Sequence, residues 1–259
     1  MSPLVEVHDL TKEFKSRVGK GVHVAVDHVS FGVEQGEAFG IVGESGSGKT
    51  TVSRMLLRLV APTSGSATID GIDVWNCTRA ERRRLPGLVQ VVFQDPYSSM
   101  NPRMSIERTL LEGIRKDVPR KSRRSEAERL LDLGGLPGRY AAMHPHQLSG
   151  GQRQRVAIAR ALAVEPRVLI ADEPVSALDV SMRGQVLNLI ASLRERLGIT
   201  VILVSHDLGV VRQFCDRVVV MSQGEIVERG DPEVILSAPS HDYTRRLVAS
   251  IPMLPTSEA

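Results

Sequence analysis

The sequence predicts an α/β protein with a parallel sheet that helices cover on both faces. Residues 168–171 and 200–204 are continuous apolar runs of strand length, and residues 182–197 between them have helical spacing. Parallel strands that are buried on both faces have this composition and alternate with helices along the chain. A glycine-rich turn at residues 43–50 follows the apolar run 38–42 and precedes another helical pattern. This order of strand, loop and helix is typical of a phosphate-binding P-loop.

Antiparallel strands are expected near both ends of the chain. Apolar residues alternate at 4–10 and 29–33, which predicts two strands of a small antiparallel β subdomain. Residues 218–221 and 226–227 flank Gln223-Gly224 in the pattern of a hairpin.

The middle of the chain predicts a helical subdomain at about residues 95–160, after a further strand at 88–93. We predict a single nucleotide-binding domain over residues 1–237. A short C-terminal tail then covers residues 238–259.

The composition is typical of a globular protein and argues against nucleic-acid binding and against a cysteine metal site. The 259 residues are 42% hydrophobic and 24% charged, which is enough to bury a sizeable core. The net charge of +3 gives little support to nucleic-acid binding. The basic run 120–124 is interpreted as a solvated helix face, because no aromatic residues are interleaved for base stacking. Cys77 and Cys215 lack metal-ligand spacing and are expected to be free thiols in a reducing cytosol.

No membrane-spanning segment is expected, because no stretch approaches the ~18 apolar residues that one needs. The N-terminus carries acidic residues early and lacks the pattern of a signal peptide. If the protein serves a membrane, we expect it to do so from the cytosolic side and through other subunits.

The turn at residues 43–50 reads GESGSGKT and matches G-x-x-x-x-G-K-[ST]. In this motif the glycines let backbone N–H groups face the phosphates, at the positive end of the following helix. Lys49 is expected to reach the β- and γ-phosphates of ATP, and Thr50 to ligate Mg²⁺. A chance Gly/Ser turn is the alternative, but the strand before it and the helix after it disfavour that interpretation. The expected phosphate site is Gly43, Glu44, Ser45, Gly46, Ser47, Gly48, Lys49, Thr50 and Thr51.

Two carboxylates follow the apolar run 168–171. Ligands of open α/β sheets bind at the carboxyl ends of the strands, where Asp172 and Glu173 emerge. We expect Asp172 to hold Mg²⁺ and Glu173 to act as the base that activates water for attack on the γ-phosphate. A surface carboxylate pair is the alternative, and the GESGSGKT loop argues against it.

A second anion site is predicted at LSGGQ, residues 148–152, which precedes a helix. A simple helix cap would explain these residues alone. Together with the phosphate loop, however, the segment resembles the signature motif of the ABC ATPase family. The resemblance implies a head-to-tail dimer in which each ATP lies between one chain's phosphate loop and the other chain's signature. The expected signature residues are Ser149, Gly150, Gly151 and Gln152.

Further residues resemble the motifs of this family. Gln94 matches the Q-loop glutamine, which senses Mg²⁺ and nucleotide and contacts the membrane subunits. Asp179 matches the D-loop at the dimer seam, and His206 matches the switch histidine at the γ-phosphate. Phe14 falls where the family stacks an aromatic residue on adenine, in a loop expected at residues 11–21. A structural histidine and a core phenylalanine are the alternatives for His206 and Phe14.

Longer segments narrow the resemblance to the ATPases of dipeptide, oligopeptide and nickel importers. These segments are QDPYSSMNPR at 94–103, EPVSALDVS at 173–181 and PSHDYTRRL at 239–247. The resemblance implies ATP hydrolysis coupled to import by two transmembrane permease subunits at the cytoplasmic face of the membrane. It also implies a second ATPase subunit, identical or related, and an extracytoplasmic substrate-binding protein that acts indirectly.

Two other functions remain as alternatives. One is a soluble ABC ATPase that acts on ribosomes or nucleic acid, and the other is the ATPase of an exporter. The segment between Gln94 and Ser149 shows no sustained heptads, as a long coiled-coil insertion would. The tail and the 94–103 segment resemble importers rather than exporters. The interpretation therefore includes no nucleic-acid partner.

Overall fold

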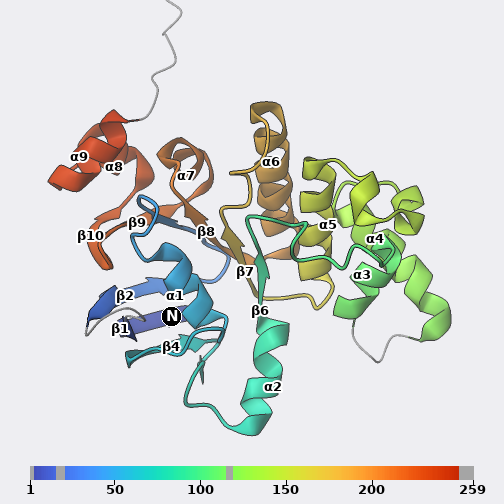
Figure 1. Cartoon of the computed structure of the whole chain (residues 1–259), viewed down its shortest axis with the longest axis horizontal. Helices are drawn as coiled ribbons and strands as arrows, with labels where there is room; N and C mark the ends of the chain where they lie inside the picture. Colours follow the sequence, from blue (N-terminus) through green and yellow to red (C-terminus); the bar gives the residue numbers. More distant parts are fainter. Residues whose placement is uncertain (1–2, 16–20, 115–118, 251–259) are drawn as a thin grey trace, which may run out of the picture.

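The computed structural model describes residues 3–15, 21–114 and 119–250. A six-stranded sheet with the order β10-β9-β3-β8-β7-β6 forms its centre (Figure 1). The five strands from β9 to β6 run parallel, and only β10 is antiparallel to its neighbour. The α/β fold class is therefore confirmed. The strands are β3 (Ala38–Val42), β6 (Val89–Val92), β7 (Val168–Asp172), β8 (Thr200–Ser205), β9 (Arg217–Ser222) and β10 (Glu225–Gly230).

A smaller antiparallel sheet has the order β2-β1-β4-β5. Its strands are longer than the sequence pattern indicates, and residues 11–15 belong to a strand rather than to the expected loop. Register shifts interrupt the pairing of β1 with β2 between Val7 and Glu13, so apolar residues lose their alternation there. Residues 16–20 of the expected loop lie outside the described residues. The strands are β1 (Val5–Lys15), β2 (Val22–Val33), β4 (Ser64–Ile69) and β5 (Ile72–Asp73).

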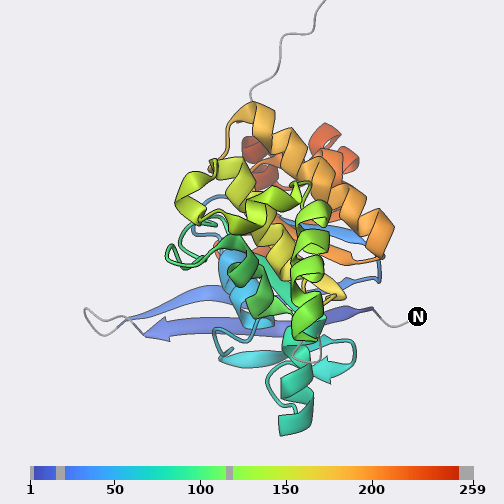
Figure 2. The ribbon, with the colours of Figure 1, turned by 90° about the vertical axis from the view of Figure 1, so that its right-hand side faces the viewer.

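Helices pack around the central sheet, and the helical segments after β6 gather on one side of the molecule (Figures 1 and 2). No helix among the described residues is long and apolar enough to cross a membrane. The gathered segments are α3 (Ile106–Gly113), α4 (Arg123–Leu133), α5 (Gly150–Leu162), η1 (Arg120–Ser122), η2 (Gly138–Ala142) and η3 (Pro145–Gln147). The other helices are α1 (Lys49–Leu56), α2 (Arg79–Leu88), α6 (Val180–Leu197), α7 (Leu208–Phe214), α8 (Pro232–Ser237) and α9 (Asp242–Ala249).

The helix α2 was not expected from the sequence. Only Leu85 is buried in it, and Pro86 lies inside it, so it lacks an apolar face and carries a helix breaker. A capping box starts this helix, because Thr78 accepts a hydrogen bond from Glu81 N–H while the Glu81 carboxylate accepts one from Thr78 N–H. That Thr-x-x-Glu spacing was the one signal from which the helix could have been predicted.

The hydrophobic core lies on both faces of the parallel sheet. In β7, Leu169 packs into one buried cluster and Ile170 into the other, and both side chains are fully buried. In β8, Leu203 and Ile202 divide in the same way. This arrangement explains why the two strands appear in the sequence as unbroken apolar runs.

The core of the helical side should control the stability of the chain. Leu130→Ala in α4 removes a side chain with 0% exposure, so we expect unfolding in urea to require about 2–5 kcal/mol less free energy. Leu59→Ala is the matched control, because Leu59 is 60% exposed and should change the free energy by less than about 0.5 kcal/mol. Equal losses in the two variants would contradict this account of the core.

Candidate functional site

The glycines of the phosphate loop are required by its geometry. Gly43 and Gly48 have φ angles of +152° and +105°, which favour glycine. A Cβ at Gly43 would lie 2.1 Å from the carbonyl oxygen of Met221, and one at Gly48 would lie 2.4 Å from that of Ala25. The loop therefore packs its backbone against β9 and β2, where no side chain fits.

Lys49 opens α1 and turns back into the loop. Its side chain is buried, and its ammonium group donates hydrogen bonds of 2.7 Å to the carbonyl oxygens of both Gly43 and Glu44. Burial lowers the pKa of Lys49, although the nearby carboxylates of Glu173 and Asp172 oppose this effect. The loop thus holds a cation that is poorly solvated and suited to pair with a phosphate.

Thr50 and Asp172 meet at the carboxyl edge of the sheet. The hydroxyl of Thr50 donates a 3.3 Å hydrogen bond to Oδ1 of Asp172, which ends β7 and is 6% exposed. Burial raises the pKa of Asp172, while the bond from Thr50 acts to lower it. A hydroxyl beside a partly uncompensated carboxylate offers the hard oxygen ligands that Mg²⁺ prefers. Among the described residues, no group of three or more His, Cys, Asp or Glu side chains is arranged to hold a metal ion.

Glu173 and His206 lie together beside this pair. His206 Nδ1 lies 3.3 Å from Glu173 Oε1, and the glutamate side chain is 18% exposed against 56% for the histidine. Glu173 has a φ of +49°, an uncommon value for a residue other than glycine, and its N–H donates to the carbonyl of Val204. This backbone turn lets Glu173 line the same cavity as Lys49.

The cavity has a volume of about 240 Å³ and contains most of the expected phosphate loop. Phe14 also lines it and is 41% exposed, so this residue is not a core phenylalanine. Opposite Phe14, across β1 and β2, lies His23, which the sequence reasoning missed. No pattern in the sequence reveals His23, because the register of this bulged pair is needed to place it. The lining residues are Phe14, His23, Ala25, Ser45, Gly46, Gly48, Lys49, Thr50, Thr51 and Glu173.

Asp172 and His206 do not line this cavity themselves, but they contact Thr50 and Glu173, which do. The signature segment, Asp179 and Gln94 do not line it either. Ser149 caps α5 by accepting a 3.3 Å hydrogen bond from Gln152 N–H, and it is exposed together with Gly150. Asp179 is an exposed residue at the start of α6. Gln94 is exposed two residues after β6, at the sheet edge where Asp172 also emerges. Ser149, Gly150 and Asp179 are thus accessible to another molecule, whereas Gly151 is buried and Gln152 is half-buried.

Comparison with known proteins agrees with this geometry. The model of the ABC transporter family matches residues 26–176. The chain belongs to the ABC transporter family. The matched segment, residues 26–176, is an ATP-binding domain.

The similar proteins include ones named as import or transport ATP-binding proteins. The chain is 46% identical over 253 residues to a Brucella ovis protein named as a peptide import ATP-binding protein, with 97% of this chain and 79% of that one covered. It is 43% identical to the oligopeptide transport ATP-binding protein OppD of Mycobacterium tuberculosis, over 97% of this chain and 42% of OppD.

Two solved structures have the same fold. The dimeric, post-hydrolysis ATP-binding cassette MJ0796 with ADP and phosphate has a TM-score of 0.78 and 33% identity, covering 88% of this chain and 98% of that one. The second is cbiO1 of Clostridium perfringens, part of the cbiONQ transporter complex. It has a TM-score of 0.80 and 28% identity, covering 92% of this chain and 93% of that one.

Lys49→Ala should lose detectable ATP binding, because it removes the only cation of the loop at residues 43–50 and leaves the phosphates uncompensated. Isothermal titration with ATP measures this loss. Lys121→Ala removes an exposed lysine in η1 and should bind ATP as the wild type does. Wild-type affinity in Lys49→Ala would remove this loop from the nucleotide site.

Proposed function

We propose that this chain is the ATP-hydrolysing subunit of an importer for peptides, at the cytoplasmic face of a membrane. The observation that carries the proposal is the single cavity in which Lys49, Thr50 and Glu173 converge on the phosphate loop. The names of similar proteins favour peptides over nickel as the cargo. They also favour a transport role over that of a soluble ABC ATPase.

The residues of the site have different roles in ATP binding and hydrolysis. Backbone N–H groups of the loop and the ammonium of Lys49 bind the phosphates of ATP, and Phe14 stacks on the adenine. Thr50 and Asp172 would hold Mg²⁺, with Gln94 as a further ligand, and this ion would neutralise charge that develops on the phosphates. Glu173 accepts a proton from the attacking water, and His206 holds the carboxylate of Glu173 through the 3.3 Å contact while reaching the γ-phosphate.

Glu173→Gln should bind ATP with wild-type affinity but lose at least about a hundredfold in turnover, because an amide cannot accept the proton of the water. ATP-bound dimers should accumulate, which light scattering can detect. The control is Glu165→Gln, which changes an exposed glutamate after α5 and should keep wild-type turnover. Near-normal turnover in Glu173→Gln would exclude Glu173 as the base.

The exposed start of the signature, Ser149 and Gly150, supports the action of two subunits on each ATP. Ser149, Gly150, Gly151 and Gln152 stand at the N-terminus of α5, where a hydroxyl, N–H groups and the positive helix end suit a phosphate. They do not line the cavity of their own chain, so they are suited to the ATP of a second ATPase subunit. Asp179 would lie at the same contact.

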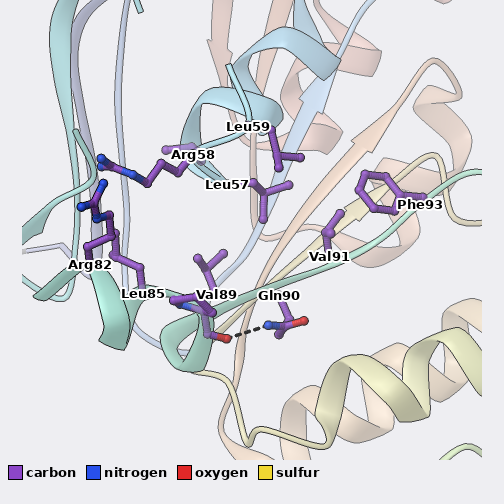
Figure 3. Close-up of a pocket in the computed structure, with 11 residues that line it drawn as sticks. Leu57, Arg58, Leu59, Arg82, Leu85, Val89, Gln90, Val91 and Phe93 are labelled. Carbon is purple, nitrogen blue, oxygen red and sulfur yellow. Dashed lines mark hydrogen bonds between the residues drawn. The ribbon is translucent and has the colours of Figure 1, made fainter. Parts of the chain in front are cut away.

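An apolar groove offers a docking site for a permease. It has a volume of about 420 Å³, and the end of α1, the helix α2 and the strand β6 line it (Figure 3). Leu57, Leu59 and Phe93 supply its apolar surface, and Arg58 and Arg82 lie at one side. We propose that a cytoplasmic permease helix with apolar and acidic residues occupies it. The groove is connected with the nucleotide site in two ways, since α1 runs to it from Lys49 and Phe93 precedes Gln94 in the chain.

The segment after Gln94 is hydrogen-bonded to α5, the helix that begins at the signature, and it does not line the groove. Gln154 of α5 donates a 3.4 Å hydrogen bond to the carbonyl of Phe93, and Arg160 bonds to the carbonyl and hydroxyl of Ser99. Met100 in this segment is 4% exposed and packs in the core, so its side chain cannot contact a permease. Tyr97 is 43% exposed and lies beneath the guanidinium of Arg153, at the surface of α5.

Leu59→Asp should abolish copurification with the permeases and transport, because it buries an unpaired charge in the proposed contact. The ATPase activity of the isolated subunit should persist, since Leu59 lies outside the nucleotide cavity. The control Val234→Asp alters a side chain of α8 with 59% exposure, close to the 60% of Leu59, and should assemble normally. Wild-type transport in Leu59→Asp would place the permease elsewhere.

A further inference from the structure

The C-terminal helix α9 reaches the phosphate loop through one side chain. The hydroxyl oxygen of Tyr243 accepts a 2.8 Å hydrogen bond from the backbone N–H of Glu44, 199 residues away in the sequence. Tyr243 is 8% exposed and packs in the main core with Leu247, one turn further along α9. Both residues lie outside the segment 26–176 that matches the family model.

Tyr243 and Lys49 hold the two sides of one peptide group. The carbonyl of Gly43 and the N–H of Glu44 belong to the same planar unit, and in a trans peptide they point in opposite directions. Lys49 donates to that carbonyl at 2.7 Å, and Tyr243 accepts from that N–H at 2.8 Å. A rotation of this peptide would therefore break both hydrogen bonds.

Other contacts must hold the peptide group between Gly43 and Glu44 against this rotation, because the residue before the peptide bond is a glycine. Gly43 has a φ of +152° and no Cβ, so its own backbone restricts the peptide group weakly. The bond to Lys49 depends on an ammonium group that the triphosphate also attracts. The hydrogen bond to Tyr243 uses an uncharged hydroxyl instead, and Tyr243 is not among the residues that line the cavity.

The helix that carries Tyr243 is itself anchored. In β10, the carboxylate of Glu228 accepts hydrogen bonds from the N–H and the hydroxyl of Ser240, both at 2.8 Å, and from His241 N–H at 3.1 Å. Burial acts to raise the pKa of Glu228, but the interactions with Thr244, Ser240 and His241 outweigh it and lower the pKa to about 2. The anchor thus stays ionised throughout the pH range of an ATPase assay. Burial also raises the pKa of Tyr243, so its hydroxyl keeps its proton there.

We propose that Tyr243 is a positioning residue for the nucleotide site, which fixes the peptide group between Gly43 and Glu44 in the orientation that the phosphate loop needs. The inference rests on the ATP-binding role proposed above for this loop. Tyr243 acts on the nucleotide through the loop and does not touch it. Its contribution should therefore be seen in ATP affinity rather than in the chemical step.

Tyr243→Phe tests this proposal, because it removes the hydroxyl and keeps the ring in the core. We expect the Kd and the KM for ATP to rise roughly two- to tenfold, the effect of one hydrogen bond, with kcat nearly unchanged. The Glu44 amide should exchange its hydrogen faster, while the melting temperature and the resistance of α9 to proteolysis stay near those of the wild type.

Ser237→Ala in α8 is the control, since it also removes a hydroxyl hydrogen bond, of 2.7 Å to the carbonyl of Glu233, but lies outside the Glu228 anchor of α9. It should keep wild-type ATP affinity. Wild-type affinity in Tyr243→Phe, or an equal loss in Ser237→Ala, would overturn the positioning role. Lys49→Ala distinguishes a failure of the proposed ATP site from a failure of the proposed role of Tyr243. If it binds ATP normally, the proposed site itself fails, whereas loss of binding in Lys49→Ala with normal binding in Tyr243→Phe refutes only the inference.

Discussion

The parallel alignment of β3, β8 and β7 brings together the phosphate loop and the acidic and histidine side chains beside it. Val42 at the end of β3 pairs with Ser205, and Val204 pairs with Asp172 at the end of β7. The phosphate loop, His206 and Glu173 therefore leave the sheet at the same edge, although they are far apart in the sequence. A slip of one residue in either pairing would turn the apolar side chains of a strand to the wrong face, so the buried core on both faces fixes this alignment.

Burial at this edge creates a balance of charge that a nucleotide and its metal ion can complete. The pKa of Lys49 is lowered and that of Asp172 is raised, in both cases mainly because the charged form is poorly solvated. The charge of Asp172 acts to raise the pKa of Lys49, and the charge of Lys49 acts to lower the pKa of Asp172. The two side chains nevertheless do not form a direct hydrogen bond. Lys49 bonds to loop carbonyls and Asp172 to Thr50. A phosphate beside Lys49 and a cation beside Asp172 would relieve both costs together, so each ligand favours binding of the other.

Local patterns in the sequence predicted the parts of the site that one segment contains. The spacing of GESGSGKT places Lys49 and Thr50, and an apolar strand ending in Asp172-Glu173 identifies the carboxylates, because the chemistry and the local structure coincide there. Phe14 was placed by resemblance, while its strand was taken for a loop because bulges hide its alternation. His23, the groove beside Leu59 and the contact of Tyr243 with Glu44 depend on strand register and on packing between distant segments. No local pattern carries that information, which is why the sequence did not reveal them.

The division between buried and exposed groups indicates how binding and hydrolysis are separated. Lys49, Asp172 and Tyr243 are buried and already held by hydrogen bonds, so the loop that binds phosphates is organised within one chain. Ser149, Asp179 and Gln94 are exposed, and none of them lines the cavity. Preorganised groups bind without the cost of being ordered, whereas exposed groups contribute only when another surface meets them. We therefore expect an isolated chain to bind ATP, and we expect the later steps to depend on the assembled partners. Because α5 carries Ser149 at its N-terminus and holds Phe93 and Ser99 through Gln154 and Arg160, movement of this helix would reach both the partner's nucleotide and the loop beside the groove.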